Sequence, residues 1–306
     1  MQVFVVGSFV VACSVKVARL PRAGESLRAS AFIAEAGGKG FNLALAMHRL
    51  GARVGGAFAV GDDPFAEVAA ASFRRAGLSP SMLLRRAGST GAGIGFVDEA
   101  GENCLAVSLG ANQSLAAGDV AGLDLDRAAL VAATFESPDA PIRAAFLRAA
   151  ETGAATLLNP SPYRPIDPKI LAATRLLVVN RVEAGEFGLA VGDDGRPRDE
   201  AALRELLDSG PRTVVVTLGS QGAVALRRDA PPLRRAAFAV EAVDAIGAGD
   251  AFAAGLAVAL LEERPLAEAL LRANACGALT VRRFGAMDAF PSAEELSDFL
   301  AEAAPG

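Results

Sequence analysis

The stretch DAIGAGDAF, residues 244–252, places two carboxylates, Asp244 and Asp250, around a Gly-Ala-Gly turn. The small, apolar run that follows, residues 251–261, predicts a buried helix with Asp250 at or near its N-terminus. Gly247 and Gly249 let the backbone turn tightly and approach a ligand closely. The free N–H groups of residues 247–250 can then converge on an anion such as a phosphoryl group, with Asp250 as a general base. A simple helix cap is the competing interpretation.

Composition describes a compact globular protein with no preference for nucleic acid. The 306 residues are 52% hydrophobic and 21% charged, with a formal net charge of −5, and the arginines form no basic block. The apolar run QVFVVGSFVV, residues 2–11, is short and β-branched, with no basic leader before it. We therefore expect a core strand rather than a signal peptide or membrane span, and a cytoplasmic protein.

Cysteine and histidine usage excludes several kinds of chemistry. Cys13, Cys104 and Cys276 are odd in number and far apart, which indicates small buried residues in a reducing compartment rather than disulfides or a metal cluster. The single histidine, His48, lies in an expected amphipathic helix and is interpreted as a surface or packing residue. Zinc chemistry and a Ser-His-Asp mechanism are both excluded on these counts.

Short β-branched runs alternate with longer Ala- and Leu-rich runs along the chain. This pattern predicts a mostly parallel sheet covered by helices on both faces, which binds ligands at the carboxyl ends of its strands. The expected strands are Val3–Val6, Val54–Val60, Leu130–Ala133, Thr156–Leu158, Leu176–Val179 and Val214–Leu218. The expected helices are Phe41–Leu50, Phe65–Ala76, Pro141–Thr152, Glu200–Ser209, Ala248–Glu262 and Leu266–Arg282.

Two regions interrupt this alternation. Residues 9–35 are extended without a convincing helix, and residues 90–109 resemble a hairpin with Gly101 in its turn. Together they predict a small second sheet over the main domain. Such a sheet can serve as a lid, or as a dimer surface where its edge is exposed.

A glycine-rich stretch, EAGGKGFNLALAMHRLGA, occupies residues 35–52. A structural turn requires one glycine, whereas three precede this helix, which indicates close approach of a ligand. Asn42, in the first helical turn, offers both a donor and an acceptor to hydroxyl groups. The stretch fits neither a Walker A loop nor a GxGxxG dinucleotide motif.

Two further motifs follow expected strands. In VVNRVEAGEF, residues 178–187, Asn180 ends a strand and Glu183 begins a helix; an acid–amide pair there suits hydrated Mg²⁺, and N-capping by Asn180 is the alternative. In TLGSQGA, residues 217–223, a glycine-rich turn closes a strand and is compatible with nucleotide phosphates.

These motifs, in this order, resemble the ribokinase-like (PfkB-type) carbohydrate kinases along nearly the whole chain. GGKGFNLA is similar to the family's N-terminal signature, and DAIGAGDAF is similar to its C-terminal signature, DTxGAGD. The resemblance implies a three-layer α/β/α sandwich with a small inserted β-sheet lid, forming one catalytic domain over residues 1–306 with lid segments at about 9–35 and 90–109. It also implies ATP-dependent phosphorylation of a carbohydrate hydroxyl.

The resemblance further implies a role for each matching residue. Asp250 is the catalytic base, the amides of Gly247, Ala248 and Gly249 form the anion hole, and Asn180 and Glu183 hold Mg²⁺ through water. The other matches are sugar-facing (Gly38, Lys39, Asn42 and Glu136), nucleotide-binding (Asn180, Thr217, Gly219, Gly222 and Asn274), or close to a monovalent cation such as K⁺ (Asp244). The family lid also forms a dimer clasp, so a homodimer is expected.

Departures from the family pattern bear on the substrate. Val10 and Ala12 stand where ribokinases carry the Asn and Asp of GSxNxD, whose Asp holds two ring hydroxyls. Because charged hydrogen bonds contribute roughly 1.5–3 kcal/mol each, this loss argues against plain D-ribose. An acceptor that is deoxygenated, apolar or bulkier on that side suits these residues better. Ala245 and Ala289 replace polar residues near the family's cation site, which argues against K⁺ dependence.

Three alternatives remain open beside the sugar kinase. A nucleoside kinase of the same fold is compatible with Val10, Ala12 and Phe41. A non-catalytic sugar- or nucleotide-binding protein is less well supported, because Asp250 and both glycines of its turn are present. A dehydrogenase is disfavoured because no GxGxxG follows a strand.

Overall fold

The computed structural model describes residues 1–306 except 99–102, 122, 124, 286 and 304–306. Within the described residues, nine strands form the central sheet in the order β13-β12-β11-β10-β9-β8-β1-β4-β5. Their bounds are β1 (Gln2–Gly7), β4 (Arg53–Val60), β5 (Leu83–Arg85), β8 (Leu130–Thr134), β9 (Ala155–Asn159), β10 (Leu176–Asn180), β11 (Thr213–Thr217), β12 (Ala223–Leu226) and β13 (Leu233–Arg235). All neighbours are parallel except β11–β12 and β12–β13. The mostly parallel sheet predicted from the alternating pattern is confirmed.

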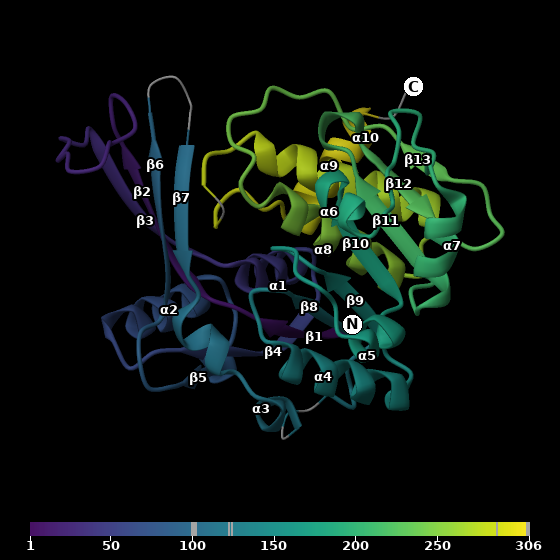
Figure 1. Ribbon diagram of the computed structural model, residues 1–306, viewed down its shortest axis with the longest axis horizontal. Helices are drawn as coiled ribbons and strands as arrows, with labels where there is room; N and C mark the ends of the chain where they lie inside the picture. Colours follow the sequence, from purple (N-terminus) through teal and green to yellow (C-terminus); the bar gives the residue numbers. More distant parts are fainter. Residues whose placement is uncertain (99–102, 122, 124, 286, 304–306) are drawn as a thin grey trace.

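Helices cover both faces of this sheet (Figure 1). Their bounds are α1 (Lys39–Arg49), α2 (Pro64–Arg75), α3 (Ala117–Ala121), α4 (Asp139–Thr152), α5 (Pro168–Ala173), α6 (Arg181–Glu186), α7 (Glu200–Asp208), α8 (Ala248–Leu261), α9 (Leu266–Val281) and α10 (Ala293–Ala303). Successive residues of β1 point to opposite faces of the sheet and so pack into two different hydrophobic cores. Val3 and Val5 pack into one core with α1, α2, α8, α9 and α10. Phe4 and Val6 pack into the other with α3–α7. The three-layer sandwich follows from this alternation.

Helix α8 is buried along most of its length because α1 and α9 pack against it. A Cβ atom added at Gly255 would lie 2.7 Å from Sγ of Cys276 in α9, so the two helices touch where the side chain is smallest. Burial raises the pKa of the Cys276 thiol to about 12, which makes it an unreactive core residue as expected. The expectation of burial is wrong for Cys104, which is exposed on a lid strand, and Cys13 is half-buried.

The lid is a separate sheet that stands beside the main body (Figure 1). Its strands run in the order β3-β2-β6-β7, and their bounds are β2 (Val10–Lys16), β3 (Ala31–Gly37), β6 (Gly91–Val97) and β7 (Asn103–Ser108). Strands β6 and β7 pair as the expected hairpin, whose predicted turn residue Gly101 lies outside the described residues. The two interruptions in the sequence pattern therefore form one sheet, as predicted.

Several elements were not expected from the sequence. Strands β5, β12 and β13 have three or four residues each, and helices α3 and α5 have five and six, so hydrophobic periodicity is too brief to reveal them. Helix α10, with 11 residues, was also not among the expected helices. Among the described residues, no helix is both long enough and apolar enough to cross a lipid bilayer.

Candidate active site

The carboxyl ends of β1 and β8 meet at the point where the strand order reverses. From β1 the chain continues to β4 on one side, while β8–β12 extend the sheet on the other. Open α/β sheets bind ligands in the crevice at such a reversal. Ser8 and Glu136 follow these two strands, and the Ser8 hydroxyl donates a 2.5 Å hydrogen bond to Oε2 of Glu136. Ser8 was not among the predicted site residues, although its place directly after a buried strand is a usable signal.

The glycine-rich N-terminus of α1 closes on this crevice. The Lys39 amide donates to Oε2 of Glu136 at 2.7 Å, and the Gly40 amide donates to the Ser8 hydroxyl oxygen at 3.1 Å. A Cβ atom at Gly40 would lie 2.2 Å from the Ser8 amide nitrogen. Gly38, with φ of 97°, similarly lies against the backbone of Ser8 and Val10. Both glycines therefore have a structural reason of their own, because they allow α1 to touch the β1–β2 turn.

Asn42 and Asp250 join α1 to α8 across the crevice. Asp250 is the third residue of α8, only 5% exposed, and its Oδ2 accepts a 2.8 Å hydrogen bond from Nδ2 of Asn42. The other amide atom of Asn42, Oδ1, is buried without a hydrogen-bond partner among the described residues. Such an orphaned acceptor costs free energy unless a bound group donates to it.

Burial raises the pKa of Asp250 above its ordinary value of 3.8. The positive charge of Lys39 and the hydrogen bond from Asn42 act in the opposite direction, and the negative charges of Glu136 and Glu183 raise the pKa further. A buried carboxylate with a raised pKa beside a helix N-terminus has the chemistry of a general base.

The turn before Asp250 has the left-handed geometry that glycine permits. Gly247 caps α8 with φ of 77°, and a Cβ atom at Gly249 would meet nothing within 4 Å. The Ala248 amide donates to the Ala245 carbonyl at 3.3 Å. In the described part of the chain, the amides of Gly247, Gly249 and Asp250 have no such partner. These amides are therefore the ones free to receive an anion.

Asp244 organises the entry to this turn. Its Oδ1 accepts from the Ile246 amide at 3.0 Å, and its Oδ2 accepts from the Gly285 amide at 3.1 Å. The carboxylate thus ties the turn to the segment after α9.

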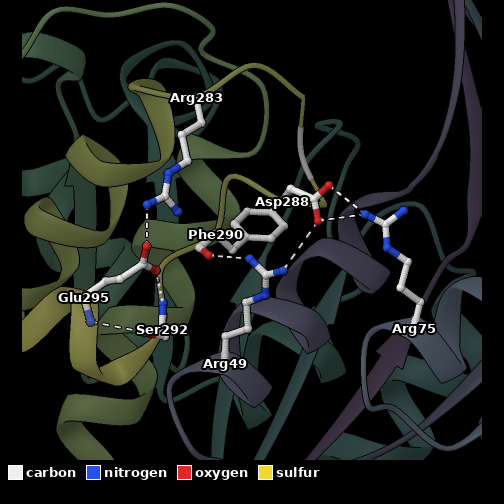
Figure 2. A network of polar contacts seen from close by, with 7 residues as sticks. All are labelled: Arg49, Arg75, Arg283, Asp288, Phe290, Ser292 and Glu295. Atoms are coloured by element: carbon white, nitrogen blue, oxygen red, sulfur yellow. Dashed lines mark hydrogen bonds and ion pairs between the residues drawn. The ribbon is translucent and has the colours of Figure 1, made fainter.

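Asp288 and Phe290, in the segment that follows α9, are bound to helices α1 and α2 (Figure 2). Asp288 bonds to Arg75 of α2 at 2.7 Å and lies 3.8 Å from Arg49 of α1. Arg49 also donates to the Phe290 carbonyl at 2.6 Å. Helices α1 and α2 therefore hold the segment whose Gly285 supports Asp244.

A cavity of about 330 Å³ opens beside the same turn. Ala248 and Gly249 form one wall, and Thr217, Gly219, Gly222 and Asn274 are among its other lining residues. The structure thus brings together most of the residues expected to bind a nucleotide. Asn274 turns its amide nitrogen to the carbonyls of Arg235 and Ala236, at 3.1 and 3.0 Å, so its Nδ2 is already engaged.

Asn180 and Glu183 form a reciprocal capping box at the start of α6. Oδ1 of Asn180 accepts from the Glu183 amide at 2.8 Å, and Oε2 of Glu183 accepts from the Asn180 amide at 3.0 Å. No group of three or more His, Cys, Asp or Glu residues suited to a metal occurs in the described ranges. With one oxygen of each side chain engaged, the pair fits an ion held through water better than one held directly.

The lid residues Val10 and Ala12 lie on β2 at the edge of the crevice. Val10 is buried and Ala12 is half-buried. Neither side chain can form a hydrogen bond. His48, at the far end of α1, packs with its ring against Gly77 and takes no part in the site.

The chain is similar to known carbohydrate kinases over nearly its whole length. Residues 1–293 match the pfkB family carbohydrate kinase model. The chain is 30% identical to the deoxyribokinase of Salmonella typhi, covering 98% of this chain and 99% of the relative, and 32% identical to the ribokinase of Mus musculus, covering 96% and 93%.

Solved structures agree with the sequence relatives. The ribokinase of Arabidopsis thaliana complexed with ribose and ATP superposes with a TM-score of 0.88 at 25% identity, covering 98% of each chain. The ribokinase of Thermotoga maritima gives a TM-score of 0.85 at 26% identity, covering 98% of this chain and 99% of the other. The protein belongs to the PfkB family of carbohydrate kinases, which are phosphotransferases with an alcohol group as acceptor.

Proposed function

We propose that the protein transfers the γ-phosphoryl group of ATP to a hydroxyl of a pentose-type sugar, with Asp250 as the general base. The observation that carries this proposal is the position of Asp250, buried at the N-terminus of α8 and held by Asn42. A carboxylate with a raised pKa beside three unpartnered amides suits proton abstraction next to a transferring phosphoryl group.

In the proposed reaction, Asp250 takes the proton of the acceptor hydroxyl as its oxygen attacks the γ-phosphorus. A new bond forms between that oxygen and phosphorus, and the bond from phosphorus to the β–γ bridging oxygen breaks, which releases ADP. The amides of Gly247, Gly249 and Asp250 stabilise the charge on the transferring group. Ala248 contributes less than the family resemblance implies, because its amide is engaged with Ala245.

The proposed nucleotide site is the cavity of about 330 Å³ beside this turn, with Thr217, Gly219, Gly222 and Asn274 in its lining. Small side chains on the wall formed by α8 leave the backbone accessible to phosphates. Mg²⁺, when bound with ATP, neutralises phosphate charge, and Asn180 and Glu183 are proposed to hold it through water. Asp244 is proposed as a support of the turn through Ile246 and Gly285, with no requirement for K⁺.

The proposed acceptor is a pentose that lacks a ring hydroxyl on the side of Ala12, in preference to plain D-ribose. Val10 and Ala12 offer no hydrogen bond there, and one relative is named a deoxyribokinase. Gly38, Lys39, Asn42 and Glu136 would surround the rest of the sugar, and the orphaned Oδ1 of Asn42 would accept from one of its hydroxyls. The apolar side chains of Val10 and Ala12 are also compatible with a nucleoside, which is the second candidate acceptor.

We also propose that the lid forms a homodimer. The lid carries exposed apolar side chains at Phe32, Ile94, Leu105 and Val107, which are 48% to 66% exposed. Exposed apolar groups on a sheet with two open edges favour association. Sedimentation at micromolar concentration should give a dimer; a monomer would contradict this part of the proposal.

The test is ADP release from Mg-ATP across a panel of pentoses, deoxypentoses, ketohexoses, sugar phosphates and nucleosides. We expect a deoxypentose to give the highest kcat/KM and ribose a lower value. If a nucleoside gives the highest kcat/KM, the protein is a nucleoside kinase, the second candidate, and not a sugar kinase. ATP binding with no acceptor that stimulates turnover would contradict the catalytic proposal and support a binding protein.

A further inference from the structure

One carboxylate on the lid is unaccounted for by the proposed site. Glu35 lies on β3, directly paired with Ala12 on β2, and it is half-buried. In the described residues its carboxylate has no hydrogen bond and no ion pair. A half-buried carboxylate without a donor is unfavourable unless water or a ligand supplies one.

Glu35 lies on the opposite face of β3 from Ala36, and it lines a cavity of about 480 Å³ together with Arg75 of α2 and Asp288. Val11 and Ala36, the neighbours of Ala12 and Glu35 along their strands, are buried in the same core as Phe73 of α2. Because successive residues of a strand point to opposite faces, Ala12 and Glu35 share the other face. Directly paired residues have Cβ atoms about 4.5–5.5 Å apart, so Glu35 borders the space in front of Ala12.

The residues paired directly with Ala12 and Glu35 across the lid sheet include a glycine. Ala12 pairs on its other side with Gly93 of β6, where a Cβ atom would make only ordinary contacts at 3.5 Å or more. Gly93 also has no left-handed backbone conformation that would require a glycine. Neither Ala12 nor Gly93 therefore blocks the approach of a ligand to the Glu35 carboxylate.

The carboxylate of Glu35 lies against the segment that follows α9. A Cβ atom built on Gly285 would lie 2.8 Å from Oε2 and 3.0 Å from Oε1 of Glu35, so the carboxylate lies against this glycine. The Gly285 amide in turn bonds to Asp244, six residues before Asp250. Along the chain, Glu35 is followed closely by Gly38 and Lys39 at the start of α1. Glu35 thus lies close in the chain to one signature and, in space, against the segment that supports Asp244 of the other.

We propose that Glu35 is an acceptor-binding residue whose carboxylate accepts a hydrogen bond from one or two hydroxyls of the carbohydrate. This inference rests on the proposed function, since it assigns a polar contact within the same acceptor site. The specificity that follows has two sides: a deoxygenated carbon lies against Ala12, and a hydroxyl-bearing carbon lies against Glu35. A carboxylate oxygen is well suited to this contact because it accepts from hydroxyls but cannot donate.

The test compares wild type with Glu35→Gln on the best acceptor and on analogues of it that each lack one hydroxyl. The change keeps the size of the side chain and removes its charge. We expect kcat/KM on the intact acceptor to fall by about 10- to 100-fold, mostly through the KM for the acceptor, because a hydrogen bond to a charged group is lost. On the analogue that lacks the contacted hydroxyl, both proteins should give the same kcat/KM, and the KM for ATP should not change.

Glu25→Gln is the matched control, since Glu25 also lies in the lid segment but is paired with Arg19 at 2.7 Å. It should leave the kinetics on every acceptor unchanged. Glu35→Asp provides a second variant, because it keeps the charge and withdraws the carboxylate by one methylene. Its kcat/KM should be reduced only on acceptors that carry the same contacted hydroxyl.

The same data separate this proposal from the function on which it rests. If wild type phosphorylates a sugar but Glu35→Gln loses activity equally on every analogue, or loses none, the role of Glu35 is overturned and the kinase proposal stands. If wild type phosphorylates no carbohydrate at all, the proposed function itself fails.

Discussion

Nδ2 of Asn42 donates a 2.8 Å hydrogen bond to Oδ2 of Asp250, and this contact joins two helices whose residues are 208 positions apart in the sequence. The donor stabilises the ionised form of a carboxylate that burial otherwise disfavours. Asn42 therefore sets both the orientation and the protonation of the proposed base, while its own Oδ1 remains available to a ligand.

The first prediction concerns the acidic limb of the pH profile. Burial raises the pKa of Asp250 above its ordinary value of 3.8, so kcat/KM should fall, as pH decreases, at a higher pH than for an exposed aspartate. In Asn42→Leu the limb should move further upward, because the hydrogen bond that lowers the pKa is lost. A limb that stays in place in Asn42→Leu, measured under kcat/KM conditions, would show that another group controls it.

The second prediction is a gain of stability on removal of the proposed base. Because the folded-state pKa of Asp250 is raised, the folded protein binds this proton more tightly than the unfolded chain does. The contribution of Asp250 to stability is therefore lost as pH rises through the folded-state pKa. Asp250→Asn should accordingly unfold at a higher temperature than wild type at pH 8. The difference should shrink towards low pH; equal melting temperatures at pH 8 would argue against the raised pKa.

The third prediction separates two glycines that belong to the two signatures. A Cβ atom at Gly40 would lie 2.2 Å from the Ser8 amide nitrogen, so Gly40→Ala should lower the free energy of unfolding by more than about 2 kcal/mol. A Cβ atom at Gly249 meets nothing within 4 Å, and this residue lines the proposed nucleotide cavity. Gly249→Ala should keep wild-type stability and raise the KM for ATP. Denaturant unfolding and steady-state kinetics on both variants check the pair, and the reverse pattern would refute it.

The fourth prediction concerns the segment after α9 (Figure 2). Arg49 donates to the Phe290 carbonyl at 2.6 Å and its side chain is 29% exposed, so Arg49→Met should cost about 1–3 kcal/mol by leaving this carbonyl unpaired. Asp288 is 70% exposed, and its ion pairs are screened by water, so Asp288→Asn should cost at most about 1 kcal/mol. Urea unfolding of both variants compares them, and a larger loss for Asp288→Asn would overturn the ranking.

The sequence predicts the layers of the fold well because the spacing of hydrophobic residues distinguishes helices from strands. Residues 251–261 are apolar on every side, which indicates a helix buried between others, and α8 packs between α1 and α9. The short strands at the edges of the sheet lack enough residues for a period. Their placement depends on pairing with neighbours that the local pattern does not contain.

The candidate site was only partly predictable, because some of its contacts join residues that are far apart in the sequence. The resemblance locates Asp250, Gly249 and Asn42 through motifs, but the bond from Ser8 to Glu136 joins residues 128 positions apart and follows only from strand order. Glycine is ambiguous in a sequence, because contact with a ligand and contact with another backbone require the same absence of a side chain. The structure resolves this ambiguity at Gly40, where the contact is with Ser8.

The most direct test of the central claim is the turnover number of Asp250→Asn with its best acceptor, measured beside its affinity for ADP. If Asp250 is the general base of a sugar kinase, kcat should fall by about 10²- to 10⁴-fold while ADP binds as tightly as to wild type. A kcat within threefold of wild type, in a variant that still binds ADP, would contradict the account.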